Sequence, residues 1–218
     1  MTIDPLELAS LIASRLCHDM LSPVGALNNG LELLADEKDP EMRKHCFALL
    51  EQSARISADK LRFFRLAFGA AGGFDSMVPL DEPRAVVDAL VANNDRVKIV
   101  WNLAGDALPK AAVKTLLNLA LIGIEALVRG GTLDIGAEQR ADPNFGTASE
   151  IVVRATGPKI AFDPVVGRAL EGKLAEGELS SRTAPAAMVS QLASSQGGGI
   201  QIALTDAALV MGAVLPVR

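Results

Sequence analysis

The first 68 residues show two long stripes of apolar side chains with helical spacing. Between Met20 and Leu34 these side chains recur at alternating intervals of four and three, which predicts one helix over residues 5–36 with a coiled-coil-like seam. Asp39 and Pro40 suit the N-cap and first turn of a second helix, which continues to about residue 68. The seam residues are Ala13, Cys17, Met20, Val24, Leu27, Leu31 and Leu34 in the first helix, and Met42, Cys46, Leu49, Leu50, Ile56, Leu61, Phe64 and Phe68 in the second.

Two long helices joined by a tight turn form an antiparallel hairpin, and a single hairpin leaves half of each seam exposed to water. A second copy of the chain would cover the exposed halves by completing a four-helix bundle. We therefore expect residues 1–70 to form a helical hairpin for dimerisation, and the protein to be a homodimer.

The rest of the chain has a mixed pattern. Residues 71–79 belong to a stretch rich in Gly and Ala and are predicted to be a linker. Residues 80–218 alternate between helix-like and strand-like segments, which predicts an α/β sandwich with one mostly antiparallel sheet under a helical layer, and hence an α+β fold class overall. The expected helices cover residues 82–94, 109–129, 164–171 and 184–195, and the expected strands cover 97–103, 132–137, 149–155, 199–204 and 207–215.

Composition narrows the classes of function. The 218 residues include 21 Lys and Arg against 26 Asp and Glu, and this net charge of −5 argues against binding to nucleic-acid phosphates. Two cysteines are too few for a disulfide framework or a zinc site. The N-terminus lacks the features of a secretory signal, and no apolar stretch reaches the roughly 18 residues that span a membrane. We therefore expect a cytoplasmic protein without nucleic-acid or membrane partners.

His18 is the candidate reactive residue of the first helix. At about 100° per residue it lies roughly 160° away from the seam, so its side chain is expected to face solvent. A solvent-facing histidine among small and apolar neighbours is typical of a surface that docks another protein. Its neighbours on this outer face are Leu11, Ser14, Arg15, Ser22, Gly25 and Asn29, with Leu21 at the edge.

Two further residues distinguish His18 from an ordinary exposed histidine. The carboxylate of Asp19, directly after it, can hold the Nδ1 proton and leave Nε2 as the nucleophile. Pro23, five residues later and inside a long helix, is expected to kink or loosen the helical turn. His45 has neither feature and is expected to be an ordinary solvated residue.

The segment around His18 resembles a known motif. Residues 17–24, Cys-His-Asp-Met-Leu-Ser-Pro-Val, resemble the H-box in the dimerisation helix of sensor histidine kinases, whose pattern is H-[DE]-x-x-x-P-[LV]. The longer run over residues 15–34 is similar to the bacterial histidine phosphotransferases that relay phosphate in alphaproteobacterial cell-cycle control. Residues 80–218 resemble in their order the ATP-binding domain of the kinases, so the resemblance covers nearly the whole chain.

This kinase-like domain departs from the family pattern where nucleotide ligands are expected. Leu116-Leu117-Asn118-Leu119 resembles the start of the N-box, but the magnesium-binding asparagine is replaced by Ile122, which offers no oxygen ligand. Ala155 stands where an aspartate binds adenine in the kinases. Residues 181–185 replace the glycine-rich lid, and Pro185 there removes a backbone N–H. We therefore expect neither ATP nor a metal ion to bind this chain.

The resemblance implies a protein phosphotransferase with a phosphohistidine intermediate and no autokinase activity. A receiver domain, for example that of a hybrid histidine kinase, would dock on the outer face, and His18 would pass the phosphoryl group to the aspartate of another response regulator. Asp19 would assist the imidazole, and the receiver would supply Mg²⁺. The candidate docking residues are Leu11, Arg15, Leu21, Ser22, Gly25 and Asn29, with Arg168 or Arg182 contributing from the second domain.

Two alternatives stay open: a histidine kinase with a divergent nucleotide site, and a scaffold or inhibitor that binds receivers or kinase bundles without carrying phosphate. Four other features have simple structural explanations. Cys17 is expected to be a core thiol, Gly197–Gly199 a hairpin turn, and Trp101 a core or interface residue. The charged residues of the second helix, Lys60 among them, are expected to form a solvated face that is also able to touch an acidic receiver.

Overall fold

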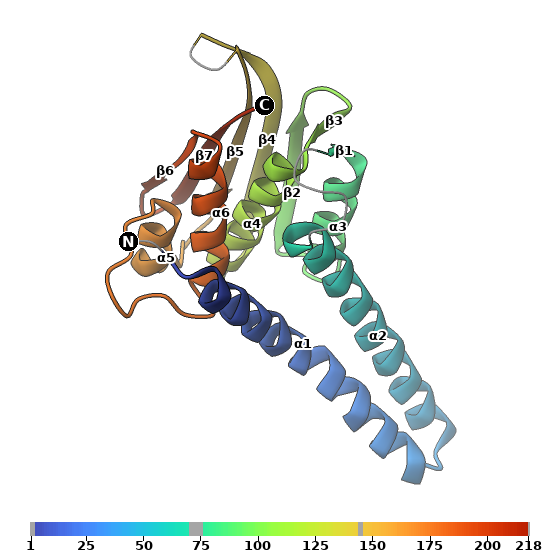
Figure 1. The fold of residues 1–218 in the computed structure, drawn as a ribbon. Coiled ribbons are helices and arrows are strands. Elements are labelled where there is room, and N and C mark those ends of the chain that lie inside the picture. The colour runs from blue at the N-terminus through green and yellow to red at the C-terminus, as the bar shows by residue number, and fades with distance from the viewer. Residues whose placement is uncertain (1–2, 70–75, 144–145, 218) are drawn as a thin grey trace.

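The computed structural model describes residues 3–69, 76–143 and 146–217. A long helical hairpin projects from a layered domain in which helices cover one face of a five-stranded sheet (Figure 1). The hairpin consists of α1 (Pro5–Asp36) and α2 (Pro40–Phe68), with the bounds that the sequence predicts. The predicted α+β class is confirmed.

Both hairpin helices begin as their sequences predict. The side chain of Asp4 accepts a hydrogen bond from the backbone N–H of Leu6, and that of Asp39 accepts one from Met42, both at 3.1 Å. A proline occupies the first turn of each helix, where a missing N–H has no helical partner to lose. At the turn between the helices, the guanidinium of Arg43 donates to the carbonyl oxygens of residues 34 and 37.

The line of α1 that packs against α2 differs from the predicted seam. α1 continues as one helix through Pro23, and Pro23 and Gly30 are buried. A Cβ atom on Gly30 would lie 2.8 Å from Cδ2 of Leu50, so glycine permits close approach of the two helices here. Some seam residues are exposed in the single chain, namely Ala13, Cys17, Val24, Leu31, Met42, Leu49 and Leu61.

This exposure agrees with the expectation that a single hairpin leaves half of each seam in contact with water. The reason is geometric: one partner helix covers only one side of an apolar stripe, and the other side has no partner within this hairpin. Cys17 is exposed and is not the core thiol that we expected, whereas Cys46 on α2 is buried.

The sheet has the strand order β2-β4-β5-β7-β6. Only β2 and β4 pair in parallel; the other neighbours are antiparallel, as predicted. The hairpin of β4 and β5 is longer than the sequence pattern indicated. The strand bounds are β2 (Val97–Leu103), β4 (Gly131–Asp142), β5 (Gly146–Thr156), β6 (Gly199–Leu204) and β7 (Ala208–Pro216).

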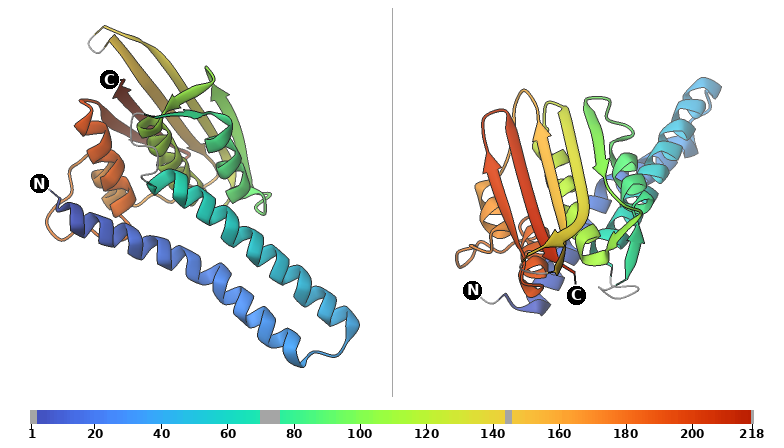
Figure 2. Two further views of the ribbon diagram at one scale, coloured as in Figure 1. Left: turned by 45° about the vertical axis from the view of Figure 1, so that its right-hand side comes forward. Right: turned by 90° about the horizontal axis from the view of Figure 1, so that it is seen from above.

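The helices of this domain lie on one face of the sheet (Figure 2). They are α3 (Asp81–Val91), α4 (Lys110–Ala126), α5 (Pro164–Leu170) and α6 (Ala184–Ser195). α4 is the central one, and residues 111–120 are all buried. Trp101 on β2 is half-buried and packs against the core, as one of its two expected roles requires, and its Nε1 donates to Asp88 of α3 at 2.9 Å.

Two short strands were not predicted. β1 (Met77–Pro79) and β3 (Ala107–Pro109) pair antiparallel and form a separate small sheet. β1 lies within the stretch that we expected to be linker; residues 71–75 of that stretch lie outside the described residues. Val78 of β1 is buried, so the chain is anchored to the second domain before α3 begins.

The glycine run after α6 is not a hairpin turn. Gly197 has a φ of +83°, and the N–H of Gly198 donates to the carbonyl of Ala193 at 2.9 Å. This pattern closes the C-terminus of α6, because glycine adopts the left-handed conformation without strain. The turn between β6 and β7 is made instead around Thr205, whose N–H donates to the carbonyl of Ala208.

The base of the hairpin belongs to the same hydrophobic core as the sheet domain. Phe63, Phe64 and Ala67 of α2 are buried together with α4, and Leu8 of α1 joins this core. The far half of the hairpin extends beyond it (Figures 1 and 2). Among the described hydrophobic residues of α1, Met20 is the last that packs against the core.

Candidate functional site

His18 lies just before the point where α1 leaves the core. Its side chain is 82% exposed, as the helical angle predicts. The ring Nδ1 lies 3.1 Å from Oδ1 of Asp19. When the proton is on Nδ1, the ring donates it to the carboxylate, and Nε2 keeps its lone pair for nucleophilic attack.

Asp19 uses its second carboxylate oxygen to bind Arg15, one helical turn earlier. Nε of Arg15 donates to Oδ2 of Asp19 at 2.7 Å, and the Nη2 of the same guanidinium pairs with Glu125 at the end of α4. Burial on its own lowers the pKa of Arg15, but the hydrogen bonds and charges of Asp19 and Glu125 outweigh it and raise the pKa above its ordinary value. A chain of polar contacts thus connects the second domain to the imidazole of His18.

The predicted docking residues divide into two groups in the structure. Leu21, Ser22 and Asn29 are exposed, and a Cβ on Gly25 would meet nothing within 4 Å. The surface of α1 on the C-terminal side of His18 is therefore open. On the other side of His18, Leu11 packs against the core and the Arg15 side chain is only 18% exposed. The expectation that these last two residues face solvent is wrong, because α1 lies against the second domain there.

Three of the residues that we compared with the kinase nucleotide motifs lie around one small cavity. Asn118, Ile122 and Pro185 line a space of about 70 Å³, and Arg15 and Asp19 of α1 close it from the hairpin side. The side chain of Asn118 donates to the carbonyl of residue 114, while its Oδ1 is buried without a hydrogen-bond partner among the described residues. Ala155 is fully buried.

Arg168 and Arg182, our candidates for docking on the second domain, are both in ion pairs. Arg168 binds both carboxylate oxygens of Glu178, through Nε at 3.0 Å and through Nη2. Arg182 lies 3.4 Å from the carboxylate of Asp163. Its own side chain is 68% exposed, so it is accessible to a docked protein.

The sequence analysis did not identify two residues of this site, one that contacts Asp19 and one that contacts Arg15. Glu125 is one; the signal was a carboxylate interrupting the apolar stretch of α4. Lys60 is the other: it is half-buried, and its Nζ donates to the backbone oxygen of Asp19 at 2.8 Å, so it is not part of the solvated face that we expected. The available signal was Pro23, four residues after Asp19: proline has no N–H, so the Asp19 carbonyl needs a donor from outside its own helix.

Within residues 3–69, 76–143 and 146–217, no three His, Cys, Asp or Glu side chains are grouped closely enough to hold a metal ion. In the same part of the chain, no helix combines the length and the apolar character needed to cross a membrane.

A helical hairpin with an exposed histidine and an adjacent aspartate, joined to an α/β sandwich, agrees with the class of two-component phosphotransfer proteins that the sequence resembles. The family model of the histidine phosphotransferase C-terminal domain matches residues 80–208. The protein phosphotransferase ChpT of Brucella abortus (strain 2308) is 41% identical over 145 residues, or 66% of this chain and 68% of that protein. A solved structure of a bacterial phosphotransferase has a TM-score of 0.82 and 32% identity, and the match covers 98% of each chain. The chain belongs to the histidine phosphotransferase family.

Proposed function

We propose that the protein relays a phosphoryl group between receiver domains through His18, in a phosphorelay of the cell-cycle-control type. The observation that supports this best is the exposed imidazole of His18 with its Nδ1 3.1 Å from the carboxylate of Asp19. An exposed ring is accessible to another protein, and the adjacent carboxylate selects the tautomer in which Nε2 is nucleophilic.

In the first transfer, the lone pair of Nε2 attacks the phosphorus of a phospho-aspartyl group. The bond from phosphorus to the aspartyl oxygen breaks, and the carboxylate leaves with its electron pair. The ring keeps its Nδ1 proton and becomes an imidazolium, whose positive charge Asp19 stabilises. The second transfer reverses these steps: the carboxylate of another receiver attacks phosphorus, and Nε2 leaves as the neutral imidazole.

The transition state of such a transfer is loose and highly charged, so positioning and electrostatics supply most of the rate. Mg²⁺ coordinated by the receiver would neutralise the charge that develops on the phosphoryl oxygens. Within this chain, Arg15 fixes one oxygen of Asp19 and leaves the other for His18. Leu21, Ser22, Gly25 and Asn29 are the open docking surface, and Leu11 and Arg15 support it from the second domain's side.

We propose that the part of the hairpin that extends beyond the hydrophobic core, from about Cys17 on α1 to Leu49 on α2, forms a homodimeric four-helix bundle. Cys17, Val24 and Leu31 are exposed on α1 at intervals of seven residues, and Met42 and Leu49 repeat that interval on α2. A seven-residue apolar repeat is the pattern by which helices pack against each other in bundles. A second copy would remove this stripe from water.

We propose that the second domain does not bind ATP. The cavity lined by the residues that replace the nucleotide motifs encloses about 70 Å³, whereas pockets for small-molecule ligands and cofactors measure roughly 300–1,000 Å³. Ile122 contributes no metal-binding oxygen, and Arg15 and Phe64 of the hairpin form part of the wall of this cavity. The domain's contribution is then to support α1 and to extend the docking surface.

The test is phosphoryl transfer from a phosphorylated receiver domain, without ATP, to the wild-type protein and to His18→Ala. We expect the wild type to acquire an acid-labile, base-stable phosphoramidate and the variant to acquire none. Continued relay through His18→Ala would refute the proposal. If several receivers fail to label the wild type, the scaffold alternative is favoured, and micromolar ATP binding would favour the kinase alternative.

A further inference from the structure

The backbone carbonyl of Asp19 lacks the hydrogen bond that a regular helix would provide. In an α-helix the carbonyl of residue i accepts from the N–H of residue i+4. For Asp19 that residue is Pro23, which has no N–H, and yet α1 continues through it. A carbonyl left in this state inside a helix needs a donor from elsewhere.

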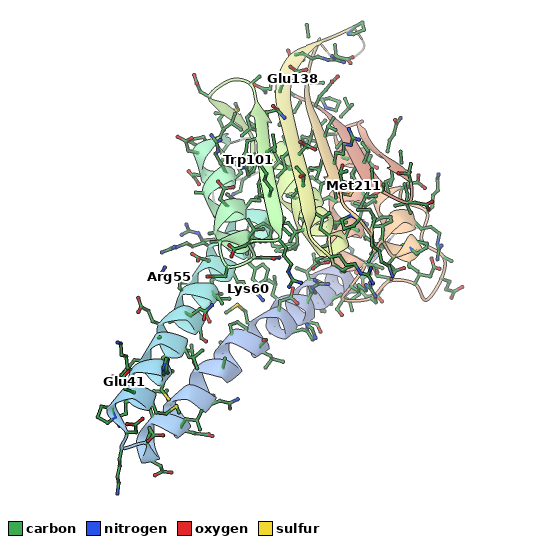
Figure 3. All side chains as sticks on the ribbon, turned by 180° about the vertical axis from the view of Figure 1, so that it is seen from behind. Glu41, Arg55, Lys60, Trp101, Glu138 and Met211 are labelled. Atoms are coloured by element: carbon green, nitrogen blue, oxygen red, sulfur yellow. The ribbon has the colours of Figure 1, made fainter. Side chains whose placement is uncertain are left out.

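The donor comes from the other helix of the hairpin. Nζ of Lys60 on α2 donates to the Asp19 carbonyl at 2.8 Å, across 41 positions of sequence. Figure 3 shows Lys60 between α2 and α1, in the part of the hairpin near the sheet domain. The contact is part-buried, so water competes with it less than at an exposed site.

We propose that Lys60 is a positioning residue for the chemistry at His18: it replaces the hydrogen bond that Pro23 removes and so fixes the backbone that bears the His18–Asp19 pair. The proposal rests on the proposed phosphotransfer function. Asp19 is then held at three points, through Oδ2 by Arg15, through Oδ1 by His18, and through its carbonyl by Lys60. Without Lys60, the turn at Pro23 is free to open, and the carboxylate loses its fixed distance to Nδ1.

The first experiment measures the rate at which His18 is phosphorylated by phosphoramidate, a small donor that needs no receiver. Nε2 attacks phosphorus and ammonia leaves, so the rate reports on His18 without a docking contribution. We expect Lys60→Met, which keeps the length of the side chain but cannot donate, to react about tenfold more slowly, the effect of losing one charge-assisted hydrogen bond. Lys60→Arg should retain most of the rate. Lys44→Met, an exposed lysine on the same helix, is the matched control and should react like the wild type.

The decisive variant combines Lys60→Met with Pro23→Ala. Alanine at this position restores the N–H that the Asp19 carbonyl accepts in a regular helix, so Lys60 is no longer needed as the donor. We expect the effect of Lys60→Met to fall to about twofold or less in this background, a coupling that a double-mutant cycle measures directly. An equal loss in both backgrounds would overturn the proposal, because it would show that Lys60 acts by another route. Circular dichroism and thermal unfolding establish that each variant folds.

The tautomer of the imidazole is a second readout, which does not need phosphoryl transfer. The ¹⁵N chemical shifts of His18 should show predominantly Nδ1–H in the wild type and a mixture of tautomers in Lys60→Met. Unchanged shifts together with an unchanged rate would overturn the role of Lys60 and leave the proposed function standing. If the wild type is unreactive but its tautomer still depends on Lys60, the positioning role of Lys60 stands and the proposed phosphotransfer function fails.

Discussion

The two halves of α1 have different partners. From residue 5 to residue 20 the helix lies against the second domain, with Leu8 buried in the core and Arg15 paired to Glu125 of α4. From residue 21 to residue 36 it contacts α2 and otherwise exposes large apolar side chains. These are Leu21 (69% exposed), Leu33 (63%), Leu31 (56%) and Val24 (42%).

The difference shows why one helix provides both a rigid and an accessible surface. The first half is stabilised by contacts within this chain, so the backbone up to His18 has a fixed place. The second half has apolar area that only another molecule can cover. His18 lies at the boundary, where its backbone is held from one side and its side chain is open to a partner.

The largest expected effect comes from equal truncations in the two halves. Leu8→Ala removes a side chain that is 7% exposed, and should lower the free energy of unfolding by about 2–5 kcal/mol through lost burial and the cavity left behind. Leu33→Ala, at 63% exposure, should change it by less than about 0.5 kcal/mol. Urea denaturation of both variants measures the difference. Similar losses for the two would contradict the division of α1.

The second prediction concerns association rather than folding. Leu31→Ala should weaken the proposed dimer by about 1.5 kcal/mol per protomer, or roughly 100-fold in Kd, because each copy loses apolar area buried in the bundle. Sedimentation equilibrium measures the change, and Leu33→Ala is the control because Leu33 lies off the seven-residue repeat. A wild type that stays monomeric at all concentrations would rule out the bundle.

The same division explains what the sequence was able to predict. Helix bounds in the hairpin depend on local signals, such as Asp39 before Pro40, and these placed both helices correctly. The apolar seam predicted that α1 has a buried side, but a stripe alone does not say which part faces α2 and which faces a further partner. Cys17 was assigned to the core for this reason and is exposed.

Contacts between distant segments were the main omission. The exposure of His18 and its contact with Asp19 follow from helical geometry and adjacency. Glu125 and Lys60 reach the site only because α4 and α2 pack beside α1, and no periodic pattern encodes that. β1 and β3 were missed for a simpler reason, since three residues are too short to show an alternating pattern.

The third prediction tests the connection between the first half of α1 and the second domain. Glu125→Gln removes the charge that pairs with Arg15 from α4, and should lower the free energy of unfolding by about 1 kcal/mol or less, since the Glu125 side chain is 48% exposed. Amide hydrogen exchange should become faster over residues 5–20 and stay unchanged over residues 21–36. Glu176→Gln, at an exposed position, is the control. Uniformly faster exchange along α1 would show that the two halves are not independent.

The last prediction concerns a part-buried ion pair within the packed domain itself, between Arg168 and Glu178. The hydrogen bonds from Arg168, and next the N–H of Ala175, hold the pKa of Glu178 below its ordinary value. A carboxyl group with a lowered pKa stabilises the folded state at any pH above its unfolded pKa, and this contribution disappears as the pH falls through the folded pKa. The difference in stability between the wild type and Glu178→Gln should therefore be constant from about pH 6 to pH 8 and shrink below about pH 4. Thermal unfolding across this range measures it, and a difference that persists unchanged at pH 3 would mean that Glu178 stabilises the loop by packing rather than by charge.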